Sequence, residues 1–241
     1  MSTQPQDLEI SGLVVGYSGS TVIDDVSIIA RAGQITALIG PNGAGKTTLL
    51  HAVGGFVRPR KGSVSIGAQD VTSQPPHKIA AHGISNVLEG RRVFRDMTVE
   101  DNLKVAASRS RPDMPSRTIS DMFDLFPILE TRRRLNASAL SGGEQQMLAI
   151  ASSLLTPTTM LLIDELSLGL APRVVSEILA TLRTLADEGI GVLLVEQSVR
   201  QAVDSADHVF VLSSGRIALS MSPDDPDAAE ATIAALFGGR P

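Results

Sequence analysis

The feature that most constrains the fold is a glycine-rich string that fits the pattern GxxxxGK[ST]. It consists of Gly40, Pro41, Asn42, Gly43, Ala44, Gly45, Lys46 and Thr47. The preceding segment, Gln34 to Ile39, is apolar enough for a buried strand, and Thr47 to Val53 is predicted to be helical. A strand, a glycine-rich loop and a helix in this order predict an α/β fold with a phosphate-binding loop.

Each fixed position of the string has a physical reason. Glycines adopt backbone conformations closed to other residues, so several backbone N–H groups can converge on phosphate oxygens. Lys46 supplies a positive charge to the β and γ phosphates, and the Thr47 hydroxyl is suited to ligate Mg²⁺. The string and the adjacent Thr48 are the predicted nucleotide contacts. A chance glycine turn is the alternative, which the flanking strand and helix disfavour.

A second candidate site ends another apolar segment. Met160 to Ile163 form a short apolar run that is followed directly by Asp164 and Glu165. Charges at the end of a buried strand are costly unless they have a task. Asp164 suits the outer sphere of Mg²⁺, and Glu165 is placed to polarise the water that attacks the γ phosphate. That both carboxylates merely cap the strand stays an open alternative.

The string LSGGEQQ, from Leu140 to Gln146, carries a family resemblance. It resembles the signature sequence of the ABC transporter ATPases, and the other motifs of that family follow in the expected order over nearly the whole chain. In that family two ATPase subunits pair head to tail. The resemblance implies that Ser141, Gly142 and Gly143 of one subunit grip the γ phosphate held by the other, with ATP and Mg²⁺ as cofactors.

Three more residues take roles only through this resemblance. Tyr17 stands where the family places an aromatic ring that stacks on adenine, although a lone surface tyrosine would look the same. Glu89 falls at the position of the family's Q-loop, where it is expected to ligate the metal. Gln197 falls at the position of the switch histidine and joins Lys46 and Glu165 as a predicted catalytic residue.

Several strings resemble one branch of the family, the ATP-binding subunit that drives branched-chain amino-acid uptake. They cover residues 89–94, 97–103, 141–150, 167–172 and 195–197. That branch carries glutamate for the Q-loop glutamine and glutamine for the switch histidine, as this chain does. A sister branch that handles urea and short amides tends to carry glutamine before Gly-Arg, so Glu89 argues against it.

Three residues depart from the family pattern. Leu166 replaces the proline that usually follows the catalytic glutamate, and Leu88 replaces a proline usual before the Q-loop position. Ser152 stands where the signature helix normally carries arginine. Leu166 relaxes the backbone beside Glu165, which leaves open a slower turnover. Ala171 replaces the aspartate of the wider family but agrees with the branched-chain branch.

Composition and charge exclude several functions. A net charge of −5 and a pI near 5.4 argue against a nucleic-acid partner, because such a surface needs clustered cationic excess. The absence of cysteine excludes disulfides and thiolate metal sites, and the histidines show no ligand spacing. The N-terminus lacks the apolar core of a signal peptide, and no apolar stretch approaches the ~20 residues that span a bilayer. We expect a cytoplasmic protein, peripheral at the inner face of the cell membrane and attached through a partner.

The whole chain, 1–241, is predicted to form one domain, a P-loop NTPase of the ABC ATPase type. A mainly parallel core sheet and an antiparallel β lobe are assigned to residues 1–90 and 155–241, and a helical lobe with the signature motif to 91–154. Strand patterns over 8–17, 22–30 and 62–66 predict the antiparallel lobe. Alternating strands and helices over 160–163, 174–188, 191–195, 199–205 and 208–212 predict the parallel sheet.

Three further helices are expected. Thr98 opens one, with Asp101 as its capping partner. A second carries an apolar stripe, assigned to the core, of Ile119, Met122, Phe123 and Phe126, and closes at Pro127. A final helix is expected over 228–237.

The leading interpretation is a transport ATPase that pairs with the same or a related ATPase chain and docks on two permease subunits. It would import a small solute supplied by an extracytoplasmic binding protein, and the solute itself is recognised on other polypeptides. One alternative is an ABC ATPase that acts on DNA or ribosomes, but such proteins usually carry two ATP domains, long coiled coils or basic extensions. The other is a non-catalytic or weakly catalytic assembly or regulatory module, which Leu166 and the missing histidine make conceivable.

Overall fold

The computed structural model describes residues 6–88, 90, 93–109, 117–224, 227, 229, 231 and 233. Its central sheet has the strand order β10-β9-β3-β8-β7-β6, with all strands parallel except β10, which lies antiparallel at one side. In chain order these strands are β3 (Ile35–Ile39), β6 (Ile84–Val87), β7 (Met160–Asp164), β8 (Gly191–Glu196), β9 (His208–Ser213) and β10 (Arg216–Met221). The predicted parallel core sheet is confirmed.

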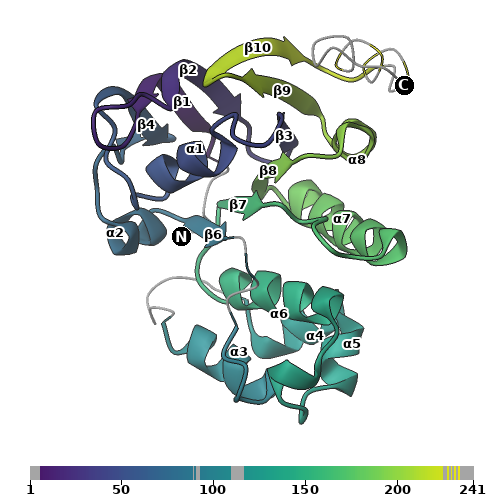
Figure 1. Cartoon of the computed structure of the whole chain (residues 1–241). Coiled ribbons are helices and arrows are strands. Elements are labelled where there is room, and N and C mark those ends of the chain that lie inside the picture. Colours follow the sequence, from purple (N-terminus) through teal and green to yellow (C-terminus); the bar gives the residue numbers. More distant parts are fainter. Residues whose placement is uncertain are drawn as a thin grey trace.

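The central strands β3, β7 and β8 are buried along their whole length, because helices cover both faces of the sheet. These helices are α1 (Lys46–Val53), α7 (Pro172–Asp187) and α8 (Val199–Ser205). Leu162 and Leu193 share an apolar cluster with α1, whereas Leu161 and Leu194 share one with α7. Alternate strand residues thus enter opposite cores, as the two-residue period of a strand requires. Figure 1 shows α1 and α7 on opposite sides of the sheet.

A second, antiparallel sheet with the order β2-β1-β4-β5 packs on the α1 side. Its strands are β1 (Leu8–Val15), β2 (Ile23–Ala30), β4 (Lys61–Ile66) and β5 (Gln69–Asp70). The predicted antiparallel lobe is confirmed, although β1 ends at Val15 and not at Tyr17. The chain turns there so tightly that a Cβ on Gly16 would come within 1.8 Å of the Ser20 carbonyl oxygen.

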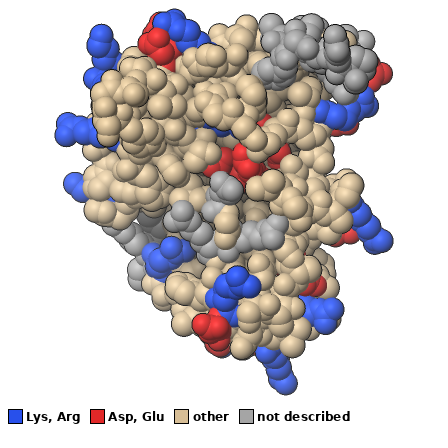
Figure 2. Space-filling model, in the orientation of Figure 1, with Lys and Arg blue, Asp and Glu red and all other residues tan. Residues whose placement is uncertain are grey.

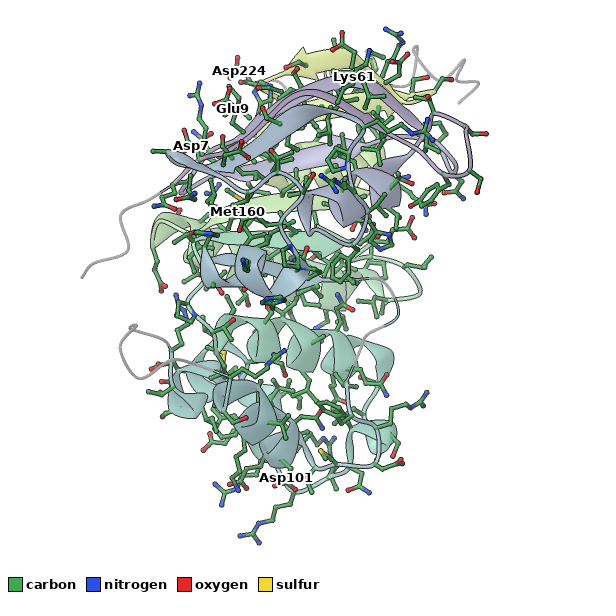
Figure 3. All side chains as sticks on the ribbon, turned by 90° about the vertical axis from the view of Figure 1, so that its left-hand side faces the viewer. Asp7, Glu9, Lys61, Asp101, Met160 and Asp224 are labelled. Atoms are coloured by element: carbon green, nitrogen blue, oxygen red, sulfur yellow. The ribbon has the colours of Figure 1, made fainter. Side chains whose placement is uncertain are left out.

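The described helices between β6 and β7 form a lobe below the core sheet in Figure 1. They are α3 (Val99–Ala107), α4 (Ile119–Leu125), α5 (Pro127–Thr131) and α6 (Gly142–Leu154), with the 3-10 turn η1 (Ala137–Ala139) before α6. The Thr98 hydroxyl accepts a hydrogen bond from the Asp101 N–H at 3.0 Å, so the predicted cap of α3 is confirmed. Met122 and Phe126 are buried in the core, as expected. Figure 3 places Asp101 at the far end of this lobe and Met160 at the level of the core sheet.

Several described elements go beyond the expectations from sequence: β5, β6, β10, α5, η1 and α2 (Pro76–Ala81). Ser85 and Asn86 interrupt the apolar pattern of β6, and β10 is a sheet-edge strand of alternating exposed and half-buried residues. Pro127 closes α4 but also suits the first position of a new helix, α5. Of the helix expected over 228–237, only residues 229, 231 and 233 are described. The division of the chain into lobes at residues 90 and 154 stays a prediction.

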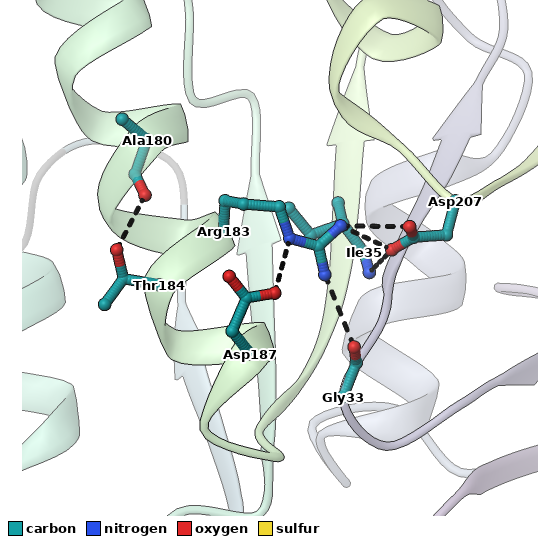
Figure 4. A network of polar contacts seen from close by, with 7 residues as sticks. All are labelled: Gly33, Ile35, Ala180, Arg183, Thr184, Asp187 and Asp207. Atoms are coloured by element: carbon teal, nitrogen blue, oxygen red, sulfur yellow. Dashed lines mark hydrogen bonds and ion pairs between the residues drawn. The ribbon is translucent and has the colours of Figure 1, made fainter.

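A polar network joins α7 to the ends of the core sheet where β3 and β9 begin (Figure 4). The Arg183 guanidinium donates from Nη1 to both carboxylate oxygens of Asp207, at 2.9 and 2.8 Å. Its Nη2 donates to the Gly33 carbonyl at 3.3 Å. Asp207 also accepts a hydrogen bond from the Ile35 N–H at 2.7 Å. The network holds together the end of the sheet where these strands begin. The candidate site lies at the other end, where the parallel strands finish.

Candidate active site

The loops that carry the predicted site residues meet where the parallel strands end. β8 lies between β3 and β7, with Ile39 of β3 paired to Glu196 and Val195 paired to Asp164 of β7. The glycine-rich loop after β3, the turn at Gln197 after β8 and the turn after β7 are therefore neighbours. Figure 2 shows acidic side chains gathered in a hollow of the molecule's surface. Ligands of open α/β sheets bind at this edge of the strands.

The glycine-rich loop is built to wrap around an anion. Gly43 has φ +81°, a conformation that side chains rarely adopt, and open space lies where its Cβ would be. Gly45 has φ +108°, and a Cβ there would come within 2.6 Å of the Ile23 side chain. The loop leads directly into α1, whose first turn holds the half-buried Thr47 and Thr48. A helix N-terminus directs unpaired backbone N–H groups toward the loop, as phosphate binding requires.

Lys46 is the first residue of α1, and its side chain folds back over the loop. The ammonium group donates to the carbonyls of Gly40 at 2.8 Å and Pro41 at 3.2 Å, and only 5% of the residue is exposed. Burial lowers the pKa of Lys46 below its usual value, although the nearby carboxylates of Glu165 and Asp164 act in the opposite direction. The structure thus brings the predicted catalytic lysine next to both predicted carboxylates.

The two carboxylates at the end of β7 lie in different environments. Asp164 is almost fully buried, with 1% exposure, whereas Glu165 is half-buried. Glu165 has φ +51°, in the left-handed region that non-glycine residues sparsely populate. Its N–H donates to the Val195 carbonyl at 3.0 Å, and the following Leu166 is buried in the apolar core. The turn is therefore held on both sides, and slower turnover through Leu166 stays a prediction.

Gln197 contacts Glu165 directly. Its side-chain Nε2 donates to Glu165 Oε1 at 2.6 Å, a short hydrogen bond between an exposed amide and a half-buried carboxylate. The two residues are 32 positions apart in sequence and meet because β7 and β8 are adjacent. The structure thus pairs the residue at the switch position with the predicted base.

A third carboxylate at this edge, Glu196, was not among the predicted site residues. It is the last residue of β8, is 2% exposed and accepts hydrogen bonds from Ser167 and Gln197. Burial raises the pKa of Glu196 above its usual range, while the hydrogen bonds from Ser167 oppose that change. The only sequence signal is a charged residue that ends an apolar strand, the same signal that singled out Asp164.

The signature residues lie in the helical lobe. Ser141 caps α6, and its hydroxyl accepts from the Glu144 N–H at 3.3 Å while Glu144 Oε2 accepts from the Ser141 N–H at 2.7 Å. A Cβ on Gly143 would come within 2.4 Å of the Val174 side chain, so glycine allows α6 and α7 to touch. Figure 1 places α6 apart from α1. One chain therefore does not bring Ser141, Gly142 and Gly143 together with its own glycine-rich loop.

Two more predicted residues have different outcomes. Tyr17 is 46% exposed in the turn between β1 and β2, and the start of β2 at Ile23 contacts Gly45 of the glycine-rich loop. Its ring is thus accessible to a ligand, and its role on adenine stays a proposal. Glu89 lies outside the described residues.

The fold and the glycine-rich loop define the class: this is a P-loop nucleotide-binding protein. The family model described as ABC transporter matches residues 23–167, more than half of the chain. The chain therefore belongs to the ABC transporter family, and the recognised family and fold are confirmed. It is an ATPase whose hydrolysis of ATP is coupled to transport.

Three curated relatives match this chain over most of their own length. A high-affinity branched-chain amino acid transport ATP-binding protein, BraG of Pseudomonas aeruginosa, is 40% identical over 84% of this chain and 87% of its own. A probable branched-chain amino acid transport ATP-binding protein, LivF of Archaeoglobus fulgidus, is 36% identical over 86% and 89%. The lipopolysaccharide export system ATP-binding protein LptB of Escherichia coli is 32% identical over 90% and 91%. The relatives therefore include subunits of branched-chain amino acid transport and of lipopolysaccharide export.

A solved structure supports the fold. The ADP conformation of an ATP-binding cassette of an ABC transporter, MJ1267, has a TM-score of 0.85 and covers 98% of this chain and 99% of its own, at 24% identity. In the part of the chain that the structure describes, no helix is long and apolar enough to cross a membrane.

Proposed function

We propose that this chain is the ATP-hydrolysing subunit of an importer for branched-chain amino acids. The observation that supports hydrolysis at this site is the 2.6 Å hydrogen bond from Gln197 to Glu165 beside the glycine-rich loop. The relatives BraG and LivF support the substrate class, since both are described as branched-chain amino acid transport proteins. Glutamine at the switch position also agrees with the branch that the sequence resembles.

The glycine-rich loop and Lys46 bind the β and γ phosphates in this proposal. Lys46 exchanges its hydrogen bonds with the Gly40 and Pro41 carbonyls for phosphate oxygens, which a small rotation of a flexible side chain allows. Thr47 and Asp164, together with Glu89, offer the oxygen ligands that Mg²⁺ prefers. When bound, Mg²⁺ neutralises charge on the phosphates and so eases attack at the γ phosphorus.

Glu165 is the proposed base that orients the attacking water. Gln197 engages one carboxylate oxygen of Glu165, so the other oxygen can accept a hydrogen bond from water. The Gln197 amide has a second N–H bond that can donate to the γ phosphate. Because charge grows on the phosphate oxygens in the transition state, that contact strengthens as the reaction proceeds.

A second ATPase subunit completes the site in this proposal. Ser141 is exposed at the N-terminus of α6, where the backbone N–H groups of Gly142 and Gly143 have no partner within the helix. In a head-to-tail pair they grip the γ phosphate on the other chain, while Tyr17 of that other chain stacks on the adenine. Binding of ATP and closure of the pair are then the same event.

A groove between the core and the helical lobe is the proposed contact with the permease. It has a volume of about 640 Å³ and is lined by α2, β6 and α6, with Phe56, Ala80, Ala149 and Ser152 among its residues. Phe56 is 48% exposed, a large apolar side chain that a partner would cover. Leu88, which departs from the family pattern as Ser152 does, lies in the same groove. Attachment there would place the protein at the inner face of the cell membrane.

The second candidate is the ATPase subunit of an exporter. LptB of Escherichia coli, a lipopolysaccharide export protein, is 32% identical over 90% of this chain. An exporter takes its substrate without an extracytoplasmic binding protein, whereas an importer of this kind requires one.

Reconstitution separates the two candidates. The native complex is purified through a tag on this chain, its subunits are identified, and it is placed in vesicles with ATP inside. We expect leucine, isoleucine or valine to enter only when a copurified or separately supplied binding protein is present outside, with Glu165→Gln as the inactive control. ATP-driven movement of a lipid-linked sugar, without amino-acid uptake, would support the exporter and refute the importer.

A further inference from the structure

Glu196 joins two loops of the candidate site. Its Oε1 accepts a hydrogen bond from the Ser167 N–H at 2.9 Å, in the turn that follows Glu165. Its Oε2 accepts from the Ser167 hydroxyl at 2.7 Å and from the Gln197 N–H at 3.3 Å. One carboxylate therefore holds the loop after β7 and the loop after β8 together.

A buried carboxylate is costly unless donors surround it. Glu196 is 2% exposed, and burial raises its pKa while Ser167 and Gln197 oppose the change through hydrogen bonds. An apolar residue would fill the end of β8 at lower cost, as Val195 does one position earlier. A buried charge at position 196 therefore needs a reason, and the hydrogen bonds that Glu196 accepts from the two loops provide one.

The geometry requires a carboxylate and not an amide. Each oxygen of Glu196 accepts from a backbone N–H, that of Ser167 on one side and that of Gln197 on the other. A glutamine would turn its own NH₂ group toward one of these donors. The Ser167 N–H contact is the shorter, and the Ser167 hydroxyl can rotate to accept from an NH₂. A glutamine at this position would thus keep the hydrogen bonds with Ser167 and lose the hydrogen bond from the Gln197 backbone N–H.

We propose that Glu196 is a positioning residue for hydrolysis, which fixes the Gln197 backbone relative to Ser167 and so aligns the Gln197 amide with Glu165. Gln197 is then held twice, by Glu196 at its N–H and by Glu165 at its side chain. The inference rests on the proposed roles of Glu165 and Gln197. It adds a residue that acts through them.

The test is Glu196→Gln, measured as phosphate release by the full chain over a range of ATP concentrations. We expect kcat to fall roughly 5- to 10-fold, the effect of weakening one hydrogen bond that aligns a reacting group, with KM for ATP changed less than about twofold. In a Gln197→Ala background the same change should alter kcat less than about twofold, because the group that Glu196 positions is gone.

Asp207→Asn is the matched control. Asp207 also accepts a hydrogen bond from a backbone N–H, that of Ile35 at 2.7 Å, but at the opposite edge of the sheet. Its change to an amide should lower the melting temperature and leave kcat within about twofold of wild type. A fall in kcat in both variants to the same extent would make the Glu196 effect one of general stability and overturn the proposal.

Should Glu196→Gln fail to fold, Glu196→Asp replaces it. Aspartate keeps the charge but is one methylene shorter, so it cannot reach both Ser167 and Gln197, and kcat should fall likewise. Wild-type kcat in the folded Glu196 variants, with Gln197→Ala impaired, refutes the positioning role alone. The positioning role is also refuted if the double variant Glu196→Gln with Gln197→Ala loses kcat by the full product of the two single effects. Wild-type kcat in Gln197→Ala instead refutes the proposed role of Gln197, and with it the reason for positioning that residue.

Discussion

Removal of the Gln197 side chain should slow hydrolysis more than it weakens ATP binding. The substitution Gln197→Ala deletes the 2.6 Å hydrogen bond to Glu165 and the proposed contact with the γ phosphate. A hydrogen bond to a charged group contributes about 1.5–3 kcal/mol, and about 1.4 kcal/mol corresponds to a tenfold change in rate. Gln197 is exposed, so solvent screening favours the lower end of that range. We expect kcat to fall about tenfold or somewhat more.

The assay is steady-state phosphate release with saturating Mg²⁺, combined with equilibrium binding of a fluorescent ATP analogue. The dissociation constant should change less than about threefold, because the contact strengthens only in the transition state. Gln69→Ala, an exposed glutamine on β5, serves as the matched control and should leave both quantities unchanged. A wild-type kcat in Gln197→Ala, or an equal loss of binding and turnover, would contradict the reasoning.

Four other outcomes are expected. Glu165→Gln should keep ATP binding, lower hydrolysis by roughly 100-fold and accumulate an ATP-bound dimer in gel filtration, and near-normal turnover would remove Glu165 from the mechanism. Ser141→Arg and Lys46→Ala should each be nearly inactive. A mixture of the two variants should regain some hydrolysis if the chain pairs with itself. Full activity of Ser141→Arg alone, independent of protein concentration, would exclude a shared site. Ala149→Arg should retain the ATPase activity of the isolated chain but fail to copurify with the permease, and normal copurification would exclude the groove as the contact. Arg183→Ala should lower the melting temperature by roughly 3–6 °C at unchanged kcat, since it breaks a partly exposed ion pair and hydrogen-bond network.

Much of the fold could be predicted because the core strands are continuous apolar runs between recognisable turns. β3, β7 and β8 are buried along their whole length, so their sequences reveal them directly. β6 and β10 could not be found in that way. β6 is short and contains Ser85 and Asn86, and β10 is an outer strand that needs no apolar face of its own.

The candidate site could be predicted where its functional residues are neighbours in sequence. The glycine-rich loop and the Asp164–Glu165 pair are local in sequence, and their spacing carries the meaning. The hydrogen bond between Gln197 and Glu165 depends on strand pairing across 32 positions, and only a family resemblance pointed to Gln197 as a site residue. The resemblance covers Glu196 too but gave it no role, and its hydrogen-bond partner Ser167 lies 29 positions away. Sequence identifies polar residues at strand ends, but only the sheet order determines which of them meet.

The close packing of Gly143 against Val174 has a mechanical consequence. Val174 lies in the first turn of α7, directly after the segment that leads away from Glu165. Gly143 lies in the first turn of α6, the helix that also carries Ala149 to the groove. There is no room for a single methyl group between the two helices at this point. A displacement of α6 at the groove should therefore also displace the start of α7. A membrane partner bound in the proposed groove would thus act on the segment after Glu165 through α6 and α7, without touching the nucleotide.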